Sequence, residues 1–266
     1  MTARTFLIHG LIAGLLAGLA AFGVAYSVGE PPVDAAIALE EASSAAEPAA
    51  PHSHDEAAPG GHSHGGDDEG TTVSRRNQST WGLLTGTLAI GTALGGVVAL
   101  AGAGLVGRIG RLRPSQSTAL VALTGFVAVA LVPFLKYPAS PPATGNPDTI
   151  GDRTSQYFTF LVISLLVAVV AWAVAGRLLP LLGTYRTVLI AAGGYLAVMA
   201  LTAGLMPSVK ELGEFPAQTL WEFRRASLLT IATLWGTLGV VLVGLVGREH
   251  QKVSVEHARR ELAASL

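Results

Sequence analysis

Residues 157–176 have the sequence YFTFLVISLLVAVVAWAVAG and contain no Asp, Glu, Lys or Arg. About 20 residues of α-helix cross the roughly 30 Å hydrocarbon core of a bilayer, so this stretch predicts a transmembrane helix. Five other stretches of 18 to 26 residues lack the same four residue types. They are Phe6–Val28, Trp81–Val106, Thr118–Leu135, Val188–Met206 and Leu228–Val246.

The composition supports a membrane protein, because 50% of the residues are hydrophobic and only 13% are charged. In lipid every backbone polar group must be satisfied internally, so the apolar stretches are expected to be helices. We predict an all-α membrane protein, a polytopic bundle of about six transmembrane helices. The alternative for the first span is a signal peptide cleaved near Ala25, which would leave five spans. The chain has no cysteine, which excludes disulfides and thiolate metal sites.

The apolar pattern divides the chain into four parts. A first transmembrane helix (1–28) precedes a His-, Asp- and Glu-rich extracytoplasmic loop (29–80) that lacks apolar periodicity and is predicted to be disordered. A five-helix membrane domain (81–246) and a cytoplasmic tail (247–266) follow. Within the membrane domain, outer loops 136–156 and 207–227 are expected to be ordered, because their prolines stiffen the backbone.

The positions of Lys and Arg near the span ends predict the orientation. With a cytoplasmic N-terminus, ten of the 17 basic residues lie inside: Arg4, Arg108, Arg111, Arg113, Arg177, Arg186, Arg248, Lys252, Arg259 and Arg260. The pairs Arg75–Arg76 and Arg224–Arg225 argue against this orientation. The same arrangement places 15 of the 18 acidic residues outside. We predict that both termini are cytoplasmic.

Four of the seven histidines fall within 13 residues of the outer loop, interleaved with carboxylates: His52, His54, His62 and His64. Imidazole suits Zn, Ni, Co and Cu, so this segment is predicted to capture metal without selecting it. The alternative is a solvated polar linker. His9, near the inner end of the first span, is a candidate intramembrane ligand, and an interfacial histidine is the alternative.

Glycine patterns in the spans indicate helix packing. Gly10, Gly14 and Gly18 form a small-xxx-small row that lets helix backbones approach closely, as do Gly91 and Gly95. The G-x-G-x-x-G match at Gly102–Gly107 ends an apolar span and does not follow a strand, so it also indicates packing. No phosphate-binding loop, nucleophile–base pair or nucleic-acid surface occurs, so we expect neither an enzyme nor a nucleic-acid partner.

Charged residues and proline turns gather at the outer ends of the spans. Candidates for an outer gate or pathway are Lys136, Tyr137, Asp148, Asp152, Arg153, Glu222 and Arg224. Carboxylates at a pore mouth attract a passing cation. The alternative is structural ion pairing that fixes the outer loops.

These motifs resemble the CbtA family of cobalt transporter subunits over nearly the whole chain. The features that carry the resemblance are the glycine-rich first span followed by Glu30-Pro31 and Ala35-Ala36-Ile37, the histidine-rich loop, Arg76 to Gln78, Lys136-Tyr137-Pro138 to Pro142, Asp148-Thr149-Ile150 with Arg153, and Phe215-Pro216 to Phe223-Arg224. The resemblance implies bacterial cobalt uptake across the cytoplasmic (inner) membrane, connected with cobalamin synthesis. It also implies a small single-span, histidine-bearing partner, CbtB.

Residues and resemblance together predict a permease for Co²⁺, with Ni²⁺ as a second substrate left open and no permanently bound cofactor. The rival hypothesis is a non-transporting accessory protein that captures metal and hands it to another permease. The scarcity of charge within the spans favours this rival, because ion-coupled carriers usually have carboxylates near the middle of the membrane.

Overall fold

The computed structural model of the chain describes residues 2–46, 74–108, 112–142, 144–145, 147–208, 213 and 215–265. Within these residues the protein is helical and has no strand. Five segments are long and apolar enough to cross a membrane: Ala3–Ser43, Arg75–Leu105, Pro114–Lys136, Ile150–Leu205 and Ala217–Ala264. This architecture agrees with the predicted all-α membrane bundle.

Three of the five segments change helix type along their length. The first comprises α1 (Ala3–Val24), the π-helical η1 (Ala25–Gly29) and α2 (Glu30–Ala46), and the second comprises α3 (Arg75–Asn77), η2 (Gln78–Gly82) and α4 (Leu83–Leu105). The third comprises α5 (Pro114–Gly125), the π-helical η3 (Phe126–Leu131) and α6 (Val132–Lys136). A short 3₁₀ turn, η4 (Pro147–Thr149), precedes α7 (Ile150–Leu205), and α8 (Ala217–Ala264) completes the fold.

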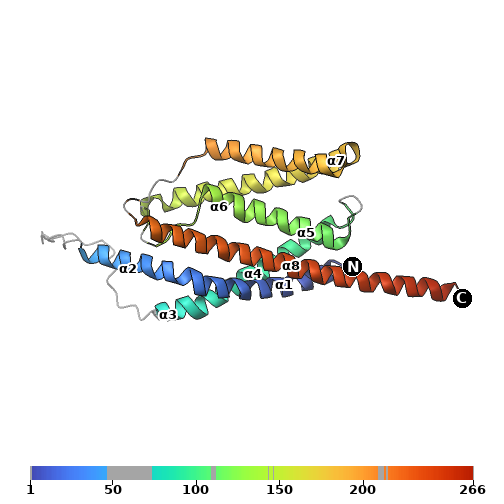
Figure 1. The fold of residues 1–266 in the computed structure, drawn as a ribbon, viewed down its shortest axis with the longest axis horizontal. Helices are drawn as coiled ribbons and strands as arrows, with labels where there is room; N and C mark the ends of the chain where they lie inside the picture. Colours follow the sequence, from blue (N-terminus) through green and yellow to red (C-terminus); the bar gives the residue numbers. More distant parts are fainter. Residues whose placement is uncertain are drawn as a thin grey trace, which may run out of the picture.

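Helix α7 contains two of the six predicted spans. Its helical geometry is broken at Gly183, whose φ of 72° and ψ of 173° are rarely adopted by residues with a side chain. Figure 1 shows that α7 folds back on itself as a hairpin. We call residues 150–182 the first limb and residues 184–205 the second limb.

Helices α1 and α4 pack backbone to backbone through the predicted glycine rows. A Cβ atom placed on Gly14 would overlap the carbonyl of Gly91, and one on Gly10 would overlap the carbonyl of Gly95. The close approach predicted for these glycines is therefore confirmed. Gly102 is buried and faces Thr118 of α5, which confirms packing as the role of this position.

The buried side chains form two clusters. One joins α1, α4, α5 and α8 and includes Phe6, Ala13, Val98, Val121, Trp235, Leu238 and Leu242. The other lies between the third segment and the α7 hairpin and consists of Ala128, Phe160, Ala168, Tyr195 and Met199. The hairpin therefore lies at the side of a tighter four-helix part and packs mainly on η3 and α6 (Figure 1).

The predicted disorder of the loop 29–80 is wrong for residues 30–46, which form α2, and for residues 75–80, which belong to α3 and η2. This stretch is rich in alanine, the residue with the highest helix propensity. The π-helical η1 ends two residues before Pro31. Pro31 and Pro32 lack backbone donors, so the α-helical bonding pattern of the preceding turn must adjust. Residues 47–73, with the four histidines of the outer loop, lie outside the described residues.

Two other boundaries also differ from the prediction. Helix α8 begins at Ala217, so half of the expected outer loop 207–227 is already helical. At its other end α8 continues to Ala264, and the expected tail is a helical extension that projects beyond the bundle (Figure 1).

Candidate functional site

Lys136 ends α6 and reaches the end of the second limb of α7. Its ammonium donates hydrogen bonds to the carbonyl oxygens of Ala203 (2.7 Å) and Met206 (3.0 Å) and to Ser208 Oγ (3.3 Å). The last carbonyls of a helix lack intrahelical partners and carry the negative end of the helix dipole. Within the described part of the chain, no carboxylate lies within ion-pair distance of Lys136. Within that part of the chain, three neutral oxygens are the hydrogen-bond partners of the ammonium.

Tyr137 makes a second link between the same two elements. Its hydroxyl donates to the Pro207 carbonyl at 2.9 Å, and its ring meets Phe160 edge-on with centroids 5.8 Å apart. Lys136 Nζ lies 5.4 Å from the centroid of the Tyr137 ring. Burial raises the pKa of the Tyr137 hydroxyl above its usual value, so the group remains a protonated donor at neutral pH.

Deeper in the hairpin interface, polar side chains meet in apolar surroundings. Ser164 of the first limb is fully buried and donates to the Ala128 carbonyl at 2.7 Å. Its Oγ lies 2.8 Å from the hydroxyl of Tyr195 on the second limb. Since Ser164 has one hydroxyl hydrogen, Tyr195 donates to it. The acceptor Ala128 belongs to the π-helical η3, a helix type that is frequent at functional sites.

A second polar contact joins the same elements. Trp172 Nε1 of the first limb donates to Thr124 Oγ1 of α5 at 3.3 Å. We define the polar seam as Ser164, Tyr195, Thr124, Trp172 and the Ala128 carbonyl. Sequence reasoning missed these residues. The sequence did contain a signal for them, because Thr124, Ser164 and Tyr195 each place a hydroxyl group inside a charge-free stretch. Such residues often form hydrogen bonds between helices in membranes.

The predicted gate residues are only partly brought together. Arg224 Nε donates to the Ala139 carbonyl at 3.4 Å, and Glu222 accepts from Gln218 Nε2 at 3.0 Å. In the part of the chain that the structure describes, Asp152 and Glu222 form no ion pair. Two of the three basic candidates, Lys136 and Arg224, thus bind carbonyl oxygens.

Two further gate candidates lie at the start of the hairpin. Asp148 is exposed in η4, one turn before the first limb. The guanidinium of Arg153 lies against Gly145, where a side chain would displace it, and the φ of 88° at Gly145 favours glycine. A role of these residues in gating stays a prediction.

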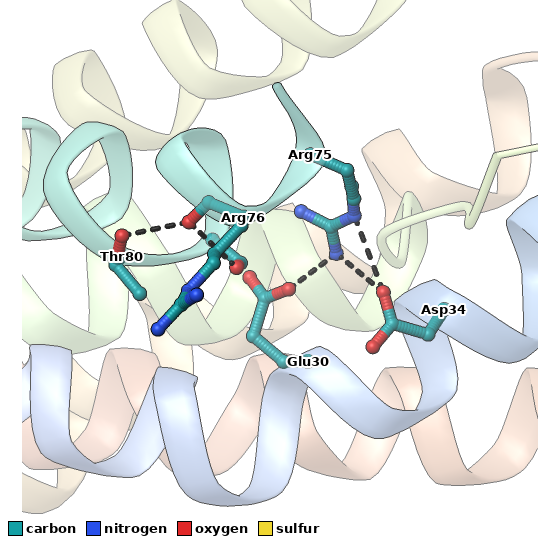
Figure 2. Close-up of polar contacts among 6 residues, drawn as sticks. Glu30, Asp34, Arg75, Arg76 and Thr80 are labelled. Atoms are coloured by element: carbon teal, nitrogen blue, oxygen red, sulfur yellow. Dashed lines mark hydrogen bonds and ion pairs between the residues drawn. The ribbon is translucent and has the colours of Figure 1, made fainter. Parts of the chain in front are cut away.

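The C-terminal end of the histidine-bearing segment is held against the start of α2. Figure 2 shows Arg75, at the start of α3, between two carboxylates of α2. It pairs with Glu30, and its Nη2 lies 2.9 Å from Asp34 Oδ1. The C-terminal flank of residues 47–73 is therefore fixed beside the start of α2, where Asp34 lies 41 residues earlier in the chain than Arg75.

No histidine in the described part of the chain belongs to a cluster of three or more metal-binding side chains. His9 is half-buried in α1, and within that same part its Nδ1 is enclosed without a hydrogen-bond partner. Metal binding by His52, His54, His62 and His64 falls on residues outside those described. The assignments of these five histidines stay predictions.

Five long apolar helical segments with a polar interface at one side define an all-α polytopic membrane protein. The family model of CbtA, described as "Probable cobalt transporter subunit", matches residues 3–247. The chain belongs to the CbtA family, as its motifs predicted, and the word subunit implies a partner. No curated protein matches the chain, and no solved structure matches it.

Proposed function

We propose that this protein imports Co²⁺ across the bacterial cytoplasmic membrane, in connection with cobalamin synthesis. The chain crosses the membrane six times, with both termini in the cytoplasm. Family membership supports cobalt as the cargo. The break at Gly183 supports an even number of crossings, because the two limbs of α7 hold separate predicted spans.

The cation path follows the polar seam between the third segment and the α7 hairpin. The observation that carries this proposal is the buried contact of Ser164 with Tyr195 and the Ala128 carbonyl. Polar groups at membrane depth are costly and commonly mark ion pathways. The interface of α1 with α4 is a poor alternative, because its glycine backbones are in direct contact.

The histidine-bearing segment raises the local metal concentration outside the membrane. In the proposed topology most of the acidic residues lie on the same side, where they attract divalent cations. The Arg75 contacts keep the C-terminal flank of this segment beside the start of α2. Asp148, Asp152, Arg153, Glu222 and Arg224 contribute to the outer mouth.

The partner we propose is a small single-span CbtB-like subunit, and the protein needs no resident cofactor. Ni²⁺ is a second candidate cargo, because nothing in an oxygen-lined path excludes it. The second candidate function is an accessory protein that captures metal for another permease. The observation in its favour is that the six predicted spans contain no Asp, Glu, Lys or Arg.

The natural absence of cysteine allows a direct test of the path. A single Ser164→Cys substitution is expected to react with a small, charged, membrane-impermeant thiol reagent during transport, and Co²⁺ should slow the reaction. Leu166→Cys is the matched control, since Leu166 lies on the same limb but is 61% exposed on the apolar surface. Equal inertness of both cysteines during cobalt uptake would place the path elsewhere.

A further inference from the structure

The outer end of the hairpin interface contains a cluster of oxygens that already holds a positive charge. We infer that the carbonyls of Ala203 and Met206, with Ser208 Oγ, form a binding site for a hydrated divalent cation. The Lys136 ammonium occupies this site as a tethered substitute, and an arriving cation displaces it. The inference rests on the proposed function and assigns the first site on the cation path.

The geometry of the three oxygens supports a cation site. All three converge on one point, with distances from Lys136 Nζ of 2.7, 3.0 and 3.3 Å. An ammonium has three N–H donors, so these contacts use its full donor capacity. Converging acceptors create a site for positive charge, and the negative end of the α7 dipole adds to it.

The chemistry of the oxygens indicates which cations fit. Carbonyl and hydroxyl oxygens suit hard divalent cations, and water completes the coordination. Among the described residues no carboxylate joins the cluster, so binding is expected to be weak. Weak binding suits a transient site, because a conducted ion must leave as readily as it enters.

The competing explanation is that Lys136 only caps the C-terminus of α7, as basic side chains often do. A cap has no reason to respond to divalent cations. Displacement by a cation instead frees the Lys136 amine and exposes it to water. The two explanations therefore differ in how Lys136 reacts when Co²⁺ or Mg²⁺ is added.

The first experiment uses the unmodified full chain, purified in detergent and treated with an amine-reactive reagent. Labelling is measured by mass spectrometry, with Lys252 as the control, since Lys252 is exposed on the extension of α8. We expect Co²⁺ and Mg²⁺ to accelerate labelling of Lys136 several-fold, with no change at Lys252. An unchanged rate at Lys136, or an equal effect of choline chloride at the same ionic strength, overturns the inference.

The second experiment removes the tethered charge. Lys136→Met leaves the three oxygens open, so its melting temperature should rise when Co²⁺ or Mg²⁺ is added. The rise should exceed that of Lys252→Met and should shrink in a Lys136→Met, Ser208→Ala double variant. Equal responses of all three variants contradict the site. If Lys136→Met does not accumulate, the labelling result decides.

Neither experiment measures transport, so the inference and the proposed function fail separately. A protein that binds the cation at this site but imports no cobalt contradicts only the proposed function. A protein that imports cobalt without any response at Lys136 contradicts only the inferred site.

Discussion

Ser164→Ala is expected to destabilise the bundle more than Tyr195→Phe does. Removing the Ser164 hydroxyl leaves two buried groups without a partner, the Ala128 carbonyl and the Tyr195 hydroxyl. One stranded polar group costs about 1–3 kcal/mol, so the total is about 2 kcal/mol or more. Removing the Tyr195 hydroxyl breaks only one interhelical hydrogen bond, because Ser164 still donates to the Ala128 carbonyl. Such a bond is worth about 0.6–1.7 kcal/mol in membrane proteins.

The double variant provides the sharper test of this network. The double variant with Ser164→Ala and Tyr195→Phe leaves only the Ala128 carbonyl without a hydrogen-bond partner. Its loss in free energy of unfolding should therefore be smaller than the sum of the losses of the two single variants. We expect a coupling of about 1 kcal/mol in a double-mutant cycle. The assay is reversible denaturant unfolding in micelles, with Ser227→Ala as control, since Ser227 bonds only within its own helix. Additive costs, or a larger loss for Tyr195→Phe, would refute the reasoning.

Three other predictions follow from the helix contacts and the histidine segment. Gly14→Ala should lower the melting temperature by several degrees because its methyl group meets the α4 backbone, whereas Gly23→Ala, in open space, should be neutral or stabilising. Gly183→Ala should be destabilising by about 1–2 kcal/mol because of its left-handed φ, whereas Gly176→Ala within the first limb should not. A peptide covering residues 50–70 should bind Ni²⁺ or Cu²⁺ more tightly than Co²⁺ by calorimetry. Its affinity should disappear below about pH 6, because protonation removes the imidazole lone pairs; tight, Co²⁺-selective binding would contradict this view.

The features that the sequence predicted correctly are those with a local physical cause. A charge-free stretch of about 20 residues must be helical in lipid, whatever its neighbours are. The row of Gly10, Gly14 and Gly18 likewise predicts close packing from spacing alone, because the three glycines share one helix face. The helix over residues 30–46 was missed because its polar composition outweighed its alanine content.

The contacts of the candidate site depend on which helices are neighbours, and one sequence does not contain that information. Lys136 lies 67 residues from the Ala203 carbonyl that it binds. Every residue has a carbonyl, so no pattern distinguishes this one. Ser164 and Tyr195 were visible as polar residues in apolar stretches, but only the fold shows that they lie at the same depth.

The central claim, that this chain carries Co²⁺ across the membrane, is tested most directly by uptake of radioactive cobalt. The host should be a bacterium without other cobalt importers, which expresses the chain with its small partner, and an empty vector is the control. We predict that cobalt uptake by this chain exceeds that of the empty vector. When His52, His54, His62 and His64 are replaced by Ala, uptake should fall at low external cobalt, while the maximal rate at high cobalt is unchanged. Uptake no greater than that of the empty vector, with the protein present in the membrane at normal amounts, would contradict the account.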